Sequence, residues 1–139
     1  VMEEFSGPDA IRRVLSAEVA KYFTETVLVS VVNGTTSARN ARVDGYQVLG
    51  KTGTAQMAYL DRRGYEPNAY MGSFIGAAPA RDPQVAVLMM IERPNPALGY
   101  YGGMVSAPGV ADILTSTLAY LQVPRDDDFL ADARPEPGM

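Results

Sequence analysis

The sequence contains no cysteine and no histidine. Without cysteine, the chain can form neither a disulfide nor a thiolate metal site. Without histidine, it cannot build a Ser-His-Asp or Cys-His catalytic group from its own residues, and zinc loses its usual nitrogen ligand. Any base for hydrolysis or acyl transfer must then be a lysine, a tyrosine or a carboxylate. We therefore expect no metal and no cofactor in this chain.

Positive charge is also scarce. Twelve Lys and Arg face sixteen Asp and Glu, and the net charge of −4 argues against a nucleic-acid partner. The longest uncharged stretch, residues 94–111, is interrupted by proline and glycine and predicts no membrane span; no signal-peptide pattern is present. The length of 139 residues and the hydrophobic content of 47% fit one globular domain. The start at Val1-Met2 leads us to expect a piece of a longer protein.

Hydrophobic periodicity predicts one helix near each end of the chain. In the first, Ser16 is the expected N-cap and apolar residues recur every four positions from Val19 to Val31. We expect that apolar face to be core and the helix to end at Asn33-Gly34. Residues 34–44 predict a solvated polar loop. The second helix follows Pro108 and places these apolar residues on one side: Val110, Ile113, Leu114, Leu118 and Leu121.

Three strands with short connections are expected between the helices, which favours an antiparallel meander. The first is the alternating run 45–49, and residues 57–69 then read as a hairpin. Residues 71–78 form the second strand. The run 85–91 is continuously apolar, which is typical of a strand buried on both faces. A loop at 94–108, rich in proline and glycine, follows.

These elements predict the α+β class, an antiparallel sheet of three strands in this chain flanked by two helices. We expect residues 1–124 to belong to one domain. The remainder, 125–139, contains three consecutive aspartates and several proline and glycine residues. It predicts an acidic, disordered tail.

The most informative stretch is Gly50-Lys51-Thr52-Gly53-Thr54-Ala55-Gln56, which we expect at the end of the first strand. Lys51 supplies a positive charge, and Thr52 and Thr54 supply hydroxyls on one face. Gly53 has no side chain, so a ligand or another backbone can approach closely. This pattern predicts a surface that grips a carboxylate lying along the strand edge.

The same letters also fit a nucleotide-binding P-loop, because Gly45 to Thr52 matches G-x-x-x-x-G-K-[ST]. A P-loop requires an apolar strand before its first glycine and a helix that begins at the lysine. Residues 37–44 do not read as a buried strand, and Gly53 follows directly after the expected helix start. We therefore reject nucleotide binding as the weaker interpretation.

Several short motifs follow one another along the chain. They occur in this order: Gly45-Tyr46, Gly50-Lys51-Thr52-Gly53-Thr54-Ala55-Gln56, Ser73-Phe74-Ile75-Gly76-Ala77-Ala78-Pro79, Tyr100-Tyr101-Gly102-Gly103 and Ser106-Ala107-Pro108. This series resembles the C-terminal part of the transpeptidase domain of class B penicillin-binding proteins, the serine enzymes that recognise penicillin. The match runs from about Ile11 to Pro124, and the Tyr-Tyr-Gly-Gly form is more similar to the cell-division type.

The resemblance implies a peptidoglycan DD-transpeptidase that cross-links stem peptides through an acyl-serine intermediate and binds β-lactams. By resemblance, Lys51 and Thr54 are catalytic, with the Thr54 N–H as one oxyanion-hole donor. Thr52, Gly53 and Thr54 bind the carboxylate of a D-Ala-D-Ala stem peptide or of a β-lactam. Tyr100 and Tyr101 are expected as substrate-binding residues that form an aromatic wall of the pocket, with packing over the core as the alternative.

The chain departs from the family pattern in one respect. The family combines Ser-x-x-Lys, Ser-x-Asn and Lys-Thr-Gly, and only the third motif is present here. No serine has a lysine three positions later or an asparagine two positions later, and Ser73 reads as a strand residue. We therefore expect the nucleophile in the remainder of the same precursor, either in the same polypeptide or as a second chain.

Two function classes stay open at this point. One is an enzyme part that becomes catalytic with the missing motifs, and the other is a non-catalytic β-lactam-sensing domain of the same fold. The resemblance implies division proteins as further partners. It also implies an extracytoplasmic location at the periplasmic face of the cytoplasmic membrane, anchored by a segment absent from this chain.

Overall fold

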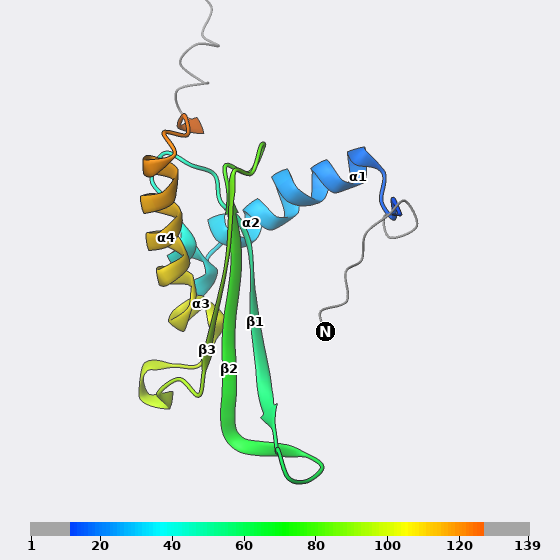
Figure 1. Cartoon of the computed structure of the whole chain (residues 1–139), viewed down its shortest axis with the longest axis vertical. Helices are drawn as coiled ribbons and strands as arrows, with labels where there is room; N and C mark the ends of the chain where they lie inside the picture. The colour runs from blue at the N-terminus through cyan, green and yellow to red at the C-terminus, as the bar shows by residue number, and fades with distance from the viewer. Residues whose placement is uncertain (1–11, 127–139) are drawn as a thin grey trace, which may run out of the picture.

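The computed structural model describes residues 12–126, which form a long sheet with helices gathered at one end (Figure 1). The predicted tail therefore lies outside the described residues from position 127 onward. Arg125 and Asp126 are described, and the Asp126 N–H donates a hydrogen bond of 2.9 Å to the Gly45 carbonyl. The Asp126 carboxylate also accepts from the Gln47 N–H. The chain after the last helix thus binds the segment that leads into the first strand.

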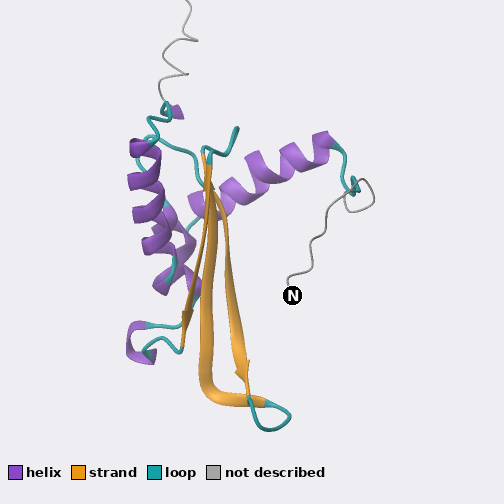
Figure 2. Ribbon diagram, in the orientation of Figure 1, coloured by secondary structure: helices purple, strands orange, loops and turns teal. Residues whose placement is uncertain are grey.

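The sheet has three antiparallel strands in the order β1-β2-β3, which confirms the predicted meander. The strands are β1 (Leu49–Ala58), β2 (Tyr65–Ala78) and β3 (Val85–Glu92). The hairpin between β1 and β2 is also confirmed, and its tip extends beyond all the helices in Figure 2. The first strand begins later than expected, because residues 43–46 form a turn closed by an isolated bridge between Val43 and Tyr46, and residues 47–48 then lead into the strand.

The first predicted helix is a rod of three segments, α1 (Ala17–Tyr22), a π-helix η2 (Phe23–Leu28) and α2 (Val29–Asn33). Ser16 is its N-cap, since its hydroxyl accepts from the Val19 N–H at 3.2 Å. The expected apolar core face is wrong for the first half, where Val19 and Phe23 are half exposed. The physical reason is that α1 projects away from the sheet and contacts little of the described chain (Figure 1).

The connection after the rod is not the solvated loop that we expected. It contains the 3-10 helix η3 (Ser37–Ala41), in which Ala38 and Ala41 are buried. Arg42 follows, and its guanidinium donates to the carbonyls of Val32 and Asn33 at 3.1 and 2.6 Å. Arg42 therefore satisfies carbonyls that the end of α2 leaves without helical partners.

The second predicted helix is α4 (Ala107–Tyr120), preceded by the 3-10 helix η4 (Pro96–Leu98) and the short α3 (Gly102–Val105). Helices α3 and α4 lie on one side of the sheet in Figure 1. Ile113 of α4 and Leu121, its C-cap, are exposed, because only the stripe with Val110, Leu114 and Leu118 faces the core. The hydrophobic core consists of these buried residues: Val32, Ala38, Ala41, Val43, Val48, Phe74, Ala78, Ala107, Val110, Leu114 and Leu118.

The prediction that residues 85–91 are buried on both faces is wrong in this chain. Strand β3 lies at the sheet edge, and its residues alternate between half-buried and exposed. Val87 and Met89 pack against the core beneath α4, whereas Leu88 and Met90 are 60% and 54% exposed on the other face. Among the described residues, no helix is long and apolar enough to cross a membrane.

Candidate functional site

The Lys-Thr-Gly stretch lies near the beginning of β1, inside the strand instead of at its end as predicted. Lys51 pairs with Ile75 of β2 and does not open a helix, which is inconsistent with a P-loop. Within residues 12–126, no strand pairs with the outer edge of β1. The backbone of residues 51–54 therefore lies at a sheet margin where an extended peptide can be added.

The Lys51 ammonium turns toward Thr52. Its Nζ donates to the Thr52 carbonyl at 2.9 Å and lies 3.4 Å from the Thr52 hydroxyl. Lys51 is exposed, so the cation is available to a ligand at the margin. An anionic group placed there meets a positive charge and a hydroxyl together, which is a strong combination for a carboxylate.

The strand register places Thr52 and Thr54 on one face of the sheet. Thr52 is opposite Phe74 and Thr54 is opposite Gly72, and directly opposed residues in an antiparallel pair share a face. Phe74 is buried beneath the helices, so this is the face that α3 and α4 cover. Lys51 starts on the opposite face and reaches Thr52 at the sheet margin.

Gly53 has a neighbour that sequence reasoning did not find. Gly53 is opposite Ser73, and a Cβ built on Gly53 would lie 2.5 Å from the Ser73 hydroxyl oxygen. A side chain at position 53 would therefore collide with Ser73. Ser73 is a strand residue, as expected, and its hydroxyl occupies one side of the gap beside Gly53.

Tyr100 and Tyr101 form a stack with a third ring, that of Tyr70. The Tyr70 and Tyr100 ring centroids are 4.3 Å apart with an angle of 16° between the planes, and the Tyr100 and Tyr101 centroids are 4.4 Å apart. Tyr70 is opposite Gln56 in the β1–β2 ladder. We call these three residues the tyrosine stack. Tyr101 is 52% exposed, so part of the stack faces solvent instead of the core.

Two of the three hydroxyls in the stack, those of Tyr100 and Tyr101, are hydrogen-bonded to each other. The Tyr100 and Tyr101 oxygens lie 3.1 Å apart. This hydrogen bond raises the pKa of Tyr100 above its ordinary value, so the phenol stays neutral at physiological pH. The stack therefore offers neutral ring faces and hydroxyls, which suit an apolar or amide-bearing group.

Backbone contacts hold the stack beside Thr54. A Cβ built on Gly72, opposite Thr54, would lie 2.8 Å from the Tyr100 carbonyl oxygen. A Cβ on Gly102 would lie only 1.8 Å from the Ser73 carbonyl oxygen. The buried Ser106 hydroxyl donates to the Gly72 carbonyl at 2.9 Å. Glycine is thus needed where this segment meets β2, and the periodicity of the sequence could not reveal that contact.

Two hollows lie in the described part of the chain, away from Lys51. One of about 620 Å³ lies between the β2–β3 turn and the end of α4, and it is lined by Arg81, Leu121 and Pro124 among others. The second adjoins it at Gln122, Val123 and Pro124 and is also lined by Tyr46. Neither is lined by residues 51–56.

Comparisons with known proteins agree with the family resemblance. The family model of the penicillin binding protein transpeptidase domain matches residues 6–115. The probable peptidoglycan D,D-transpeptidase PbpC of Pseudomonas aeruginosa is 39% identical over 117 residues, covering 84% of this chain and 20% of that protein. Stage V sporulation protein D of Bacillus subtilis is 40% identical over 117 residues, covering 84% of this chain and 17% of that protein.

A solved structure is similar in fold as well as in sequence. The apo structure of the TP domain from Burkholderia pseudomallei penicillin-binding protein 3 superposes with a TM-score of 0.70 at 38% identity. The match covers 83% of this chain and 34% of that one. The chain thus spans about a fifth of the length of the two curated relatives above.

Proposed function

Because the chain belongs to the penicillin binding protein transpeptidase domain family, we propose that it supplies the substrate-clamping wall of a peptidoglycan D,D-transpeptidase. The observation that carries the proposal is the Lys51 ammonium beside Thr52 at the free margin of β1. Relatives at 39% and 40% identity align with most of the chain, and the first of them is named as a probable transpeptidase.

Lys51 and Thr52 bind the terminal carboxylate of a D-Ala-D-Ala stem peptide, and Thr54 completes the grip with its hydroxyl. Gly53 lets the peptide lie along β1 as an added strand. A β-lactam presents a comparable carboxylate to the same groups. The ligand is held mainly by charge-assisted hydrogen bonds, which fix its carbonyl in one orientation.

A serine outside this chain attacks the penultimate carbonyl. The oxyanion that forms accepts hydrogen bonds from the Thr54 N–H and from the N–H of the serine itself. Collapse of this intermediate breaks the peptide bond, releases the terminal D-Ala and leaves an acyl-serine. An amine from a second stem peptide then attacks the acyl group, forms the cross-link and frees the serine. No cofactor enters these steps.

The tyrosine stack forms an aromatic wall beside the clamp. It lies next to Thr54 and Gln56 along β1, as the contacts of Gly72 and the pairing of Gln56 with Tyr70 indicate. We propose that the stack contacts the side chain of the bound acyl group. The exposed part of Tyr101 supports contact with a ligand more than packing over the core.

The remainder of the precursor covers the open face of the sheet and supplies Ser-x-x-Lys and Ser-x-Asn, in the same polypeptide or as a second chain. The exposed apolar residues on that face and on α1 support this, since soluble proteins seldom leave such patches uncovered. They are Val19, Phe23, Ile75, Leu88 and Met90. Division proteins are the further partners that we propose. The site of action is extracytoplasmic, where peptidoglycan cross-linking takes place.

The test is labelling of the complete protein with a fluorescent penicillin. Lys51→Ala should slow labelling by about 100-fold, the typical effect of losing a charged transition-state contact. Lys21→Ala is the matched control, because Lys21 is the other lysine of the sequence and lies exposed on α1. Equal rates for Lys51→Ala and the parent protein would remove Lys51 from the site.

Mapping of the labelled residue separates the candidate functions. Acylation of a serine in a Ser-x-x-Lys motif outside residues 1–139, with turnover of a stem peptide, supports the transpeptidase. Acylation without turnover supports a β-lactam-sensing domain instead. Stabilisation by nucleotides with no label would contradict both.

A further inference from the structure

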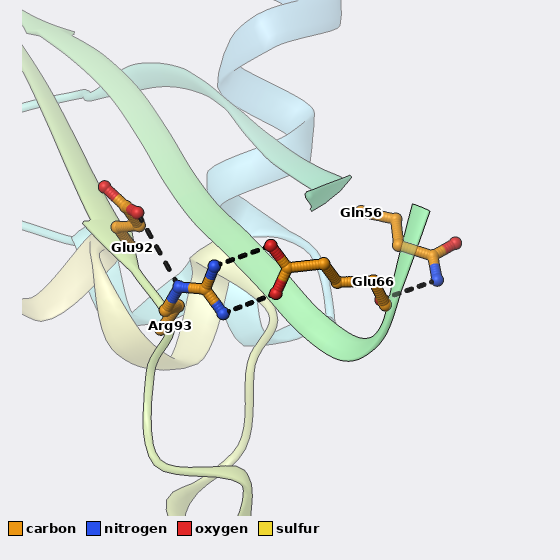
Figure 3. A network of polar contacts seen from close by, with 4 residues as sticks. All are labelled: Gln56, Glu66, Glu92 and Arg93. Atoms are coloured by element: carbon orange, nitrogen blue, oxygen red, sulfur yellow. Dashed lines mark hydrogen bonds and ion pairs between the residues drawn. The ribbon is translucent and has the colours of Figure 1, made fainter. Parts of the chain in front are cut away.

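A bidentate ion pair lies at the far end of the sheet from Lys51. The two terminal guanidinium nitrogens of Arg93 donate to the two carboxylate oxygens of Glu66 at 2.7 and 2.8 Å (Figure 3). The Arg93 Nε also lies 3.8 Å from a carboxylate oxygen of Glu92. The bonds from Arg93 lower the pKa of Glu66, and the same bonds raise the pKa of Arg93. The pair therefore stays ionised over the physiological range.

This pair lies just beyond the point where the β2–β3 ladder stops and the β1–β2 ladder shifts its register. The β2–β3 ladder ends at Met71 and Glu92, and the regular β1–β2 ladder ends at Gln56 and Tyr70, where the register shifts. The backbone is irregular here as well, since Asn68 and Arg93 have φ angles of 57° and 50°. Few ladder hydrogen bonds hold this end of the sheet, so side chains must position it.

The tyrosine stack begins at this pair. The Arg93 N–H donates to the Tyr70 carbonyl at 2.9 Å, and the Tyr70 ring stacks on Tyr100. Seven residues after Arg93, the chain reaches Tyr100 itself. Arg93 therefore holds Glu66 by its side chain and Tyr70 by its backbone, and it also starts the loop that ends in the other rings of the stack.

Glu66 makes a connection to the first strand. The Gln56 side-chain amide donates to the Glu66 carbonyl at 3.1 Å (Figure 3). Gln56 is two residues beyond Thr54 in β1. The contacts of Gln56, Glu66 and Arg93 thus connect β1, β2 and the residue after β3 at the level of the tyrosine stack. Exposed ion pairs contribute little to folding stability, but a bidentate arginine–carboxylate pair fixes orientation well.

We infer that Glu66 and Arg93 are positioning residues for the tyrosine stack, and that through it they set the preference for the acyl side chain of the ligand. This inference rests on the proposed function. Neither residue contacts the clamp at Lys51, so the pair acts on the part of the ligand that lies against the rings. Loss of the pair lets Tyr70 and the loop from 94 to 101 move independently, which removes a preformed surface for an aromatic or apolar group.

The test measures acylation of the complete protein by two penicillins. Benzylpenicillin has a phenylacetyl side chain and 6-aminopenicillanic acid has none, so the ratio of their second-order acylation rates reports the side-chain contact. Glu66→Gln, which keeps the shape of the side chain, and Arg93→Gln should lower this ratio about three- to tenfold. The rate with 6-aminopenicillanic acid should change by less than about twofold.

The reversed pair, Glu66→Arg with Arg93→Glu, should restore much of the ratio, which a general loss of structure would not allow. Arg93→Lys keeps the positive charge but loses the bidentate hydrogen bonds of the guanidinium, and it should give an intermediate ratio of the two acylation rates. Arg81→Gln is the matched control, because Arg81 is exposed in the β2–β3 turn at the opposite end of the sheet.

An unchanged ratio in both single variants would overturn the inference, and so would equal slowing with both penicillins. In either case a slow Lys51→Ala variant would still support the proposed function. If the parent protein is acylated by neither penicillin, the proposed function fails and this inference fails with it.

Discussion

The two faces of the sheet are built from different kinds of side chain. On the face beneath α3 and α4, β2 alternates glycine with a single large ring, Phe74, which is fully buried. The helices come so close that a Cβ on Gly72 would collide with Val105. On the other face, Ile75 and Leu88 are 50% and 60% exposed, although they are as apolar as the core.

This contrast distinguishes the face of the sheet that the chain buries with its own helices from the face that we propose another part of the protein covers. The covered face has small residues where helices approach and large ones where space remains, which is the packing of a finished core. The open face has large apolar residues that stay half exposed among the described residues. The Lys51 ammonium lies at the margin between the two faces, so the proposed clamp lies where the helix-covered face of the sheet meets the open face.

The largest effect is expected on the covered face. Phe74→Ala in the complete protein should lower the free energy of unfolding by about 3–5 kcal/mol, because a buried ring leaves a cavity among residues of the core. Urea unfolding measures the change. Tyr120→Ala is the control, since Tyr120 is 84% exposed on α4 and should change stability by less than about 0.5 kcal/mol. Similar losses in the free energy of unfolding for the two variants would contradict the view that the covered face is a well-packed core.

The close fit of the helices can be tested next. Gly72→Ala adds a methyl group 2.7 Å from a Val105 methyl carbon and should destabilise the protein by about 1–3 kcal/mol. It should also disturb the ligand side-chain preference, because the Tyr100 carbonyl is the other group that must move. Ser73→Ala, at the neighbouring position, is the control. A Gly72→Ala variant as stable as the parent would mean that the fit is looser than the distances indicate.

The open face gives a smaller effect. If the remainder of the protein covers it, Leu88→Ser should cost about 1.5 kcal/mol in the complete protein, through lost burial of an apolar side chain. Leu60→Ser is the matched control, since Leu60 is fully exposed at the hairpin tip. Equal stability of the two variants would show that water, not protein, contacts the open face.

The smallest effect belongs to the ion pair at the end of the sheet. Because Arg93 lowers the pKa of Glu66, the pair stabilises the fold above the ordinary pKa of a glutamate, about 4.3, and this contribution is lost as pH falls through the lowered value. Thermal unfolding of the parent protein and Glu66→Gln should therefore differ slightly at pH 7, and the difference should shrink as the pH falls through the lowered pKa of Glu66. A difference that grows on acidification would contradict this sign.

Sequence reasoning located the elements and the candidate clamp, but it misjudged burial. It predicted Val19 and Phe23 as core because their spacing is helical, and spacing cannot tell whether anything faces the helix. It missed Tyr70, Glu66 and Arg93 because single residues have no local pattern; only the strand register brings Tyr70 opposite Gln56. The roles of Lys51, Thr54, Tyr100 and Tyr101 stay predictions until the rate measurements above.

By itself, the sequence determined the class of the fold, the three-stranded meander and the family, because each is encoded in local periodicity, turns and ordered motifs. Tertiary structure alone decided which face of the sheet the helices cover and where the Lys51 ammonium points. It also decided which residues support the tyrosine rings. The physical reason is that burial and side-chain contact depend on which segments the strand ladders and the helix packing bring together. Contacts between residues far apart in the chain leave no local pattern in the sequence.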